Sequence, residues 1–166
     1  MLLGESEKQR CVIFHGKAGS GKSRLARYTA NIFESHWKNE TKGIYDEKIS
    51  PEDAHKQLLV MNEANMYRLF SKSKGLPMMK RLMEGDGASL ENKYGHPFTG
   101  FLNAYTLITC NMLPCPFVEP VSSNSGFTNE EYIGEKEAMD ERVKLVCFTD
   151  RFHDSNIEEF SELDWA

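Results

Sequence analysis

The stretch FHGKAGSGKS, residues 14–23, lies between a short apolar run and a helical pattern. Its last eight residues satisfy the spacing G-x-x-x-x-G-K-[ST], in which backbone N–H groups turn towards phosphate oxygens at the start of a helix. We expect Lys22 to reach the β and γ phosphates of a nucleotide, and the Ser23 hydroxyl to bind Mg²⁺. The predicted binding loop comprises Gly16, Lys17, Ala18, Gly19, Ser20, Gly21, Lys22 and Ser23.

The composition is that of an ordinary globular protein. With 166 residues the chain suffices for one domain of about five strands with covering helices, and a second domain does not fit. No apolar run approaches the roughly 18 residues that would span a bilayer, and no leader opens the chain, so we expect an intracellular protein. The net charge of -5 argues against a surface that coats nucleic acid, so any such contact must be local.

The cysteines are too few and too scattered for a disulfide framework. Three of them lie in or beside apolar runs, which predicts reduced, buried thiols. Cys110 and Cys115 have no matching second pair, which argues against a zinc site. The four are Cys11, Cys110, Cys115 and Cys147.

Apolar runs alternate with helical patterns along the chain, which predicts an α/β fold. A helix is expected over 23–37, with Leu25, Tyr28, Thr29, Ile32 and Phe33 on one face, and another over 76–85. Turn residues predict a hairpin over 88–100 and a long surface loop over 114–126. Strands are expected at 11–15, 42–48, 58–63, 105–111 and 142–148.

Polar residues follow two of these strands where each ends. Glu63 is a candidate for the carboxylate that activates the attacking water, and the alternative is an exposed glutamate after a strand. Asn62 stands where an acidic residue often completes a magnesium site, and its amide can hold a metal-bound water. Asn111 is a candidate sensor of the γ-phosphate, although asparagine is also a common turn residue.

Three further residues, in two segments, are candidates for functional contacts. Arg142 opens the last expected strand, as either a surface charge or an arginine finger that stabilises charge on the γ-phosphate. Lys93 and Tyr94 lie at the expected hairpin tip, where a cation beside an aromatic ring suits single-stranded nucleic acid and a solvated lysine is the plainer interpretation.

In this order the elements resemble a superfamily 3 helicase of the AAA+ class, the ATPase motor of small DNA virus replication proteins. FHGKAGSGKS resembles the family's Walker A motif, LLVMNE its Walker B, MKRLMEGDGASLENKYGHP its B′ motif and LITCNMLP its motif C. MDERVKLVCF is similar to the segment that carries the arginine finger. Parvovirus and densovirus non-structural replication proteins fit best.

The resemblance implies a P-loop NTPase of AAA+ type, with a central, mostly parallel five-stranded sheet flanked by helices and a β-hairpin insertion. It implies ATP and Mg²⁺ as cofactors, and Lys22, Glu63 and Asn111 as catalytic residues. Ser23, Asn62 and Glu63 would form the metal site. Arg142 would act on ATP held by the next subunit of a ring, a hexamer when assembled, and Lys80 would approach nucleotide from a neighbouring subunit.

The resemblance also implies three partners: single-stranded DNA at Lys93 and Tyr94, further copies of the chain, and the rest of a longer replication protein. It implies a location in a host nucleus. Residues 1–166 would form one helicase domain of that protein. A nicking nuclease domain is not expected within them, because the sequence has no His-x-His pair with a nearby tyrosine. Cys110 replaces the usual serine of motif C, and Asn62 the common acid of Walker B. Two other functions stay open: a small P-loop nucleotide kinase, and a nucleotide-gated assembly module with little hydrolysis.

Overall fold

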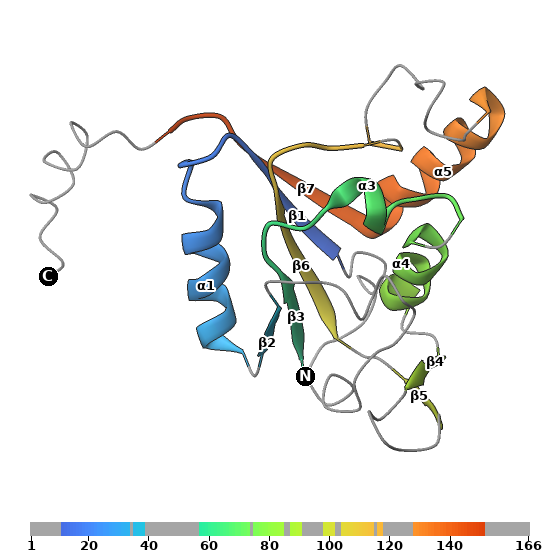
Figure 1. Ribbon diagram of the computed structural model, residues 1–166, viewed down its shortest axis with the longest axis horizontal. Helices are drawn as coiled ribbons and strands as arrows, with labels where there is room; N and C mark the ends of the chain where they lie inside the picture. Colours follow the sequence, from blue (N-terminus) through green and yellow to red (C-terminus); the bar gives the residue numbers. More distant parts are fainter. Residues whose placement is uncertain are drawn as a thin grey trace, which may run out of the picture.

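A parallel five-stranded sheet forms the centre of the protein in the computed structural model, which describes residues 11–33, 35–38, 57–73, 75–84, 87–90, 98–101, 104–114, 116–117 and 128–151 (Figure 1). The strand order is β2-β3-β6-β1-β7, and every neighbouring pair is parallel. All five carboxyl ends therefore lie at one edge, called here the carboxyl edge. The strands are β1 (Cys11–Gly16), β2 (Ser35–Lys38), β3 (Leu58–Met61), β6 (Tyr105–Cys110) and β7 (Val143–Phe148).

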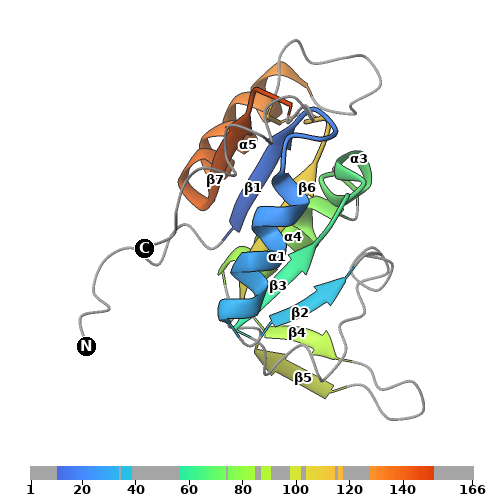
Figure 2. The ribbon, with the colours of Figure 1, turned by 90° about the vertical axis from the view of Figure 1, so that its left-hand side faces the viewer.

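Helices cover both faces of this sheet, with α1 on one side and α3, α4 and α5 on the other (Figures 1 and 2). Successive side chains of each strand point to opposite faces of the sheet, and both faces are apolar. Phe14 and Val60 pack towards α1, while Ile13 and Leu59 belong to the cluster containing α3 and α4. This second cluster is the larger and is rich in methionine from α4. The helices are α1 (Lys22–Ile32), α3 (Met66–Leu69), α4 (Gly75–Glu84) and α5 (Asn129–Arg142).

A separate antiparallel pair, β4 (Gly87–Leu90) and β5 (Phe98–Phe101), follows α4. Leu90 is paired with Phe98, and Gly87 with Phe101. The segment that joins the two strands carries Lys93 and Tyr94, and both lie outside the described residues.

The expected α/β class with a parallel sheet flanked by helices is confirmed. The helix expected over 23–37 is wrong at its end, because α1 stops at Ile32 and 35–38 pair with β3 as a strand. Its buried residues are Lys22, Ala26 and Ala30, so the bulky face expected there is largely exposed. The face of α1 that packs on the sheet is the one with small residues, because these let the helix lie close to the strands.

The expectations for the cysteines, for the segments 42–48 and 114–126 and for the last helix have different outcomes. Cys11 and Cys110 are buried free thiols, whereas Cys147 is exposed on the edge strand β7, so burial was wrongly expected there. The strand expected at 42–48 and Cys115 lie outside the described residues, as does most of the loop expected at 114–126. Helix α5 was not expected at all. Within the described ranges, no helix is long and apolar enough to cross a membrane.

Candidate active site

The loop between β1 and α1 wraps around the buried side chain of Lys22. Its Nζ donates hydrogen bonds to the carbonyls of Gly16 at 2.8 Å and Lys17 at 2.6 Å, and to Ser20 Oγ at 3.3 Å. Gly19 and Gly21 have φ angles of 80° and 84°, which side chains disfavour and which the turn requires. The loop thus holds an ammonium group whose three protons all meet uncharged oxygens.

Burial lowers the pKa of Lys22, while the nearby Cys110 and Glu63 act in the opposite direction. The side chain is only 6% exposed. A buried cation surrounded by uncharged acceptors is a favourable place for an anion, because an anion would restore the electrostatic stabilisation that burial removes.

The turn after β3 is attached to the end of β6. The Glu63 N–H donates to Thr109 Oγ1 at 2.8 Å, and the Thr109 hydroxyl donates to Asn62 Oδ1 at 2.9 Å. The Ala64 N–H donates to the Thr109 carbonyl at 3.0 Å. Glu63 has a φ of 52°, a left-handed conformation that costs a residue with a side chain about 1 kcal/mol or more.

Lys22, Glu63 and Thr109 line a cavity of about 180 Å³ on the carboxyl edge. That volume is smaller than a typical site for a whole small molecule and suits phosphate groups alone. Its lining comprises Ala18, Gly19, Ser20, Gly21, Lys22, Ser23, Arg24, Glu63, Thr109, Cys110 and Asn111.

The cavity therefore brings together Lys22, Ser23, Glu63 and Asn111, which were predicted from separate parts of the sequence. Cys110 also lines it, but burial raises the pKa of this thiol to about 11, despite the opposing influence of Lys22. It is consequently protonated at neutral pH and is no nucleophile.

The oxygen donors in this lining fit a hard divalent cation. Ser23 and Glu63 both line the cavity and carry side-chain oxygens, and Mg²⁺ takes oxygen ligands, often few from protein beside water and phosphate. Asn62 does not line the cavity, and its Oδ1 accepts a hydrogen bond from the Thr109 hydroxyl. In the part of the chain that the structure describes, no group of three or more His, Cys, Asp or Glu side chains forms a dedicated metal site.

Arg142 lies apart from this cavity. It is the last residue of α5 rather than the first of β7, and β7 pairs Val143 with Cys11 and Phe148 with Gly16. Arg142 thus lies at the opposite edge of the sheet, roughly 17 Å from the loop at about 3.3 Å per residue. Its guanidinium donates to Glu84 Oε1 at 2.7 Å and to the Ala138 carbonyl at 2.9 Å.

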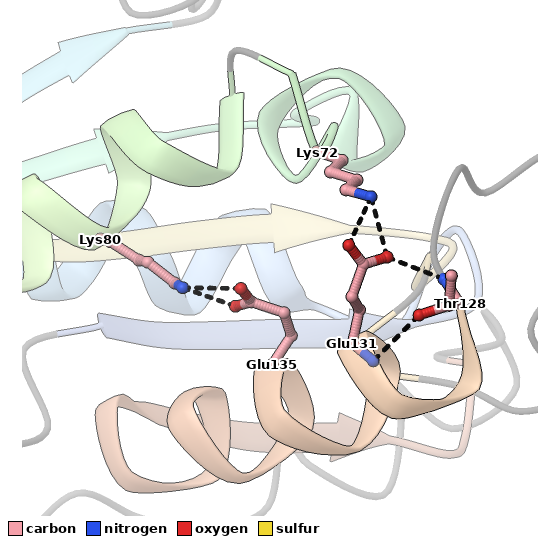
Figure 3. Close-up of polar contacts among 5 residues, drawn as sticks. All are labelled: Lys72, Lys80, Thr128, Glu131 and Glu135. Carbon is pink, nitrogen blue, oxygen red and sulfur yellow. Dashed lines mark hydrogen bonds and ion pairs between the residues drawn. The ribbon is translucent and has the colours of Figure 1, made fainter.

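Lys80 also lies outside the cavity, in an ion pair between helices. Its Nζ is 2.8 Å and 2.7 Å from the two carboxylate oxygens of Glu135, and Lys72 pairs with Glu131 at 2.8 Å (Figure 3). We call these two pairs, together with Glu84–Arg142, the ion-pair face. Each cation there already has a carboxylate partner, so the cavity of about 340 Å³ beside Lys72 and Lys80 offers an anion little net charge.

A family model matches residues 14–125, about two thirds of the chain. The chain belongs to DUF5906, a family of unknown function. The DUF5906 match begins at Phe14, just before the loop, and covers Lys22, Glu63 and Asn111. It ends before α5 and β7, so Arg142 lies outside it.

No curated protein matches the chain. Among solved structures, the A-form apo structure of the NrS-1 C-terminal region is similar, with a TM-score of 0.53 at 17% identity over 98% of this chain and 32% of that one. The apo structure of NrS-1 residues 305–718 gives 0.51 at 19% identity, over 83% and 37%. The chain spans about a third of these structures, and the likeness shows a shared fold for this DUF5906 member.

Thr109 is a site residue that the sequence analysis missed. It is 1% exposed, and its hydroxyl connects residues 46 and 47 positions away. Threonine is common in strands, so its type and place in an apolar run gave no sign of this role. A buried hydroxyl does need partners, and that rule could have drawn attention to it.

Proposed function

We propose that this DUF5906 protein is an ATP-dependent DNA helicase motor for viral genome replication, related to the superfamily 3 helicases. The supporting observation is the cavity at the carboxyl edge, where a buried lysine, a hydroxyl, a carboxylate and an amide from three segments converge. In open α/β sheets ligands bind outside the carboxyl ends of the strands, and this cavity has that position.

Four of the side chains that line the cavity have a role in ATP hydrolysis. Lys22 leaves its carbonyl partners to bind the β and γ phosphates, which supply the negative charge its buried ammonium lacks. Glu63 accepts the proton of the attacking water, and Asn111 donates a hydrogen bond to the γ-phosphate. Mg²⁺, when bound, neutralises charge on the phosphate oxygens; Ser23 and Glu63 would hold it, with Asn62 on a bound water.

The position of Arg142 favours a site shared between copies. At the far edge of the sheet it serves the cavity of a neighbouring subunit in a ring, where its guanidinium stabilises charge on the γ-phosphate. Single-stranded DNA passes along the segment with Lys93 and Tyr94, whose ring stacks on bases. Moving that strand is the work that hydrolysis drives.

The test is ATP binding and turnover, with and without single-stranded DNA, for four variants of the chain. Lys22→Ala should weaken ATP binding about 10- to 100-fold, as expected for loss of a charged hydrogen bond. Glu63→Gln should retain binding and lower turnover about 100- to 10,000-fold, the range for a lost general base. Lys144→Ala removes an exposed lysine of β7 and serves as the control for charge.

Two outcomes would contradict the proposal. Transfer of the γ-phosphate to a nucleoside acceptor would make the protein a nucleotide kinase. Unchanged turnover in Glu63→Gln would leave a binding module whose assembly responds to nucleotide. Stimulation of wild-type turnover by single-stranded DNA, lost in Lys93→Ala, is the result that a helicase motor requires.

A further inference from the structure

The turn that presents Glu63 to the cavity depends on one side chain from another strand. The last paired residues of β3 and β6 are Met61 and Ile108, so the regular ladder ends just before Asn62. From there Thr109 contacts each of the next three residues: its hydroxyl bonds to Asn62 Oδ1 and the Glu63 N–H, and its carbonyl accepts from the Ala64 N–H. These contacts replace the ladder beyond its end.

The direction of each hydrogen bond is fixed by the chemistry of the groups. The backbone N–H of Glu63 can only donate, so the Thr109 hydroxyl accepts from it at 2.8 Å. The single hydroxyl proton then goes to Asn62 Oδ1, at 2.9 Å. A side chain at position 109 must both accept and donate to complete this arrangement, which serine can do and valine cannot.

The arrangement holds Glu63 in a conformation that its own side chain disfavours. A φ of 52° lies in the left-handed region, which residues with a side chain seldom adopt without support. In this conformation Glu63 lines the cavity beside Lys22, although it directly follows the buried end of β3. The orientation of the carboxylate is therefore a property of the turn.

We propose that Thr109 is a positioning residue, whose hydroxyl holds Glu63 in the left-handed turn and so directs its carboxylate towards the phosphate cavity. The hydrolytic consequence rests on the proposed function. The Thr109 hydroxyl does not donate to phosphate in this proposal. It already accepts from the Glu63 N–H, and its single proton goes to Asn62 Oδ1. Asn62 accordingly acts as the anchor of that hydroxyl, in addition to any contact with a metal-bound water.

The experiment compares Thr109→Val with Thr109→Ser in the full chain. Valine keeps the shape and loses both hydrogen bonds, so kcat should fall about 10- to 100-fold, the range for a lost supporting contact, while ATP affinity changes less than threefold. Serine keeps the hydroxyl and should restore kcat to within about threefold of wild type. Equal losses in both variants, or unchanged kcat in Thr109→Val, would overturn the proposal.

A second readout is independent of hydrolysis. Backbone amide hydrogen exchange at Glu63 should speed up at least tenfold in Thr109→Val and stay near wild type in Thr109→Ser, because only valine releases that N–H. If wild-type turnover equals that of Glu63→Gln, the proposed hydrolysis fails, and exchange at Glu63 still decides whether Thr109 holds the turn. Unchanged exchange in Thr109→Val would show that it does not.

Thr109→Val leaves the Glu63 N–H and Asn62 Oδ1 without their hydroxyl partner, so Asn62→Ala serves as a second and milder variant. It removes the acceptor of the hydroxyl proton while Thr109 still receives the Glu63 N–H. We expect it to lower kcat in the same direction, by less than Thr109→Val. An increase in kcat would contradict the role assigned to the pair.

Discussion

Lys22 at the carboxyl edge and the lysines of the ion-pair face are held in different ways. Lys22 is buried and bonded to two carbonyls and a hydroxyl. Lys72, in the turn before α4, and Lys80, in α4, pair with carboxylates of α5, with 46% and 32% of their side chains exposed. The charge of a cation with uncharged partners is not neutralised and can attract an anionic ligand. The charge of a cation paired with a carboxylate is already neutralised. The contrast separates a binding site from a structural contact.

Arg142 tests this contrast most strongly, because it belongs to the ion-pair face yet is proposed to act on nucleotide. Arg142→Ala should leave ATP affinity nearly unchanged and lower turnover on the order of a thousandfold, as for loss of an arginine finger. Steady-state ATPase assays with single-stranded DNA measure this. Glu84→Gln is the matched control: it breaks the 2.7 Å ion pair and leaves the guanidinium in place.

Exposed ion pairs contribute only about 0–1 kcal/mol, so Glu84→Gln should retain wild-type turnover. Equal losses in both variants would mean that Arg142 acts only by holding α5 to α4. Mixing Arg142→Ala with Lys22→Ala adds a sharper test. If the finger serves a neighbouring copy, the mixture regains turnover at sites that combine the intact loop of one variant with the intact arginine of the other.

Glycine substitutions compare how tightly the two regions are packed. A Cβ added at Gly16 would overlap the carbonyl oxygen of Phe148 in β7, so Gly16→Ala should lower the free energy of unfolding by about 1–3 kcal/mol. Gly134 lies inside α5 with nothing within 4 Å of the added atom. Gly134→Ala should raise the free energy of unfolding by up to about 1 kcal/mol through helix propensity.

Urea denaturation followed by circular dichroism measures both changes. Opposite signs are expected, with the larger effect at Gly16. A loss at Gly134 as large as that at Gly16 would show that α5 is packed as closely as the loop, and would remove the difference between the regions.

Most of the sheet could be predicted from sequence because its strands are short apolar runs. Residues 58–61 and 105–110 are almost wholly buried, and their polar ends mark the carboxyl edge. Lys22, Glu63 and Asn111 could be placed near one another for the same reason, since parallel strands bring their ends together. This part of the fold is encoded locally.

Helix α5 could not be predicted from periodicity, because it buries only Tyr132 and Met139 and carries charge all round. Its capping box, Thr128 with Glu131, was a local signal that went unused. Thr109 is a different case, since its partners lie 46 and 47 residues away in sequence. No local pattern contains such a contact, and only the assembled sheet reveals it.

Glu131 gives the smallest expected effect, which comes from the ion-pair face. The hydrogen bond from Lys72, followed by that from the Thr128 N–H, lowers the pKa of this carboxyl from 4.5 to about 2. A carboxyl with a depressed folded pKa stabilises the protein above its unfolded pKa and loses that contribution as pH falls. The stabilisation by Glu131 should therefore be complete above about pH 4.5 and disappear between pH 4.5 and 2.

Glu131→Gln isolates this charge, because glutamine can still complete the capping box. The difference in melting temperature between wild type and Glu131→Gln should be constant near neutral pH and shrink towards zero at pH 2. Glu130→Gln controls for the loss of a negative charge in the same helical turn. Salt at about 1 M shortens the Debye length to roughly 3 Å and should reduce the difference, since the pair with Lys72 is exposed. A difference independent of both pH and salt would mean that Glu131 stabilises α5 through its cap alone, with no contribution from the ion pair.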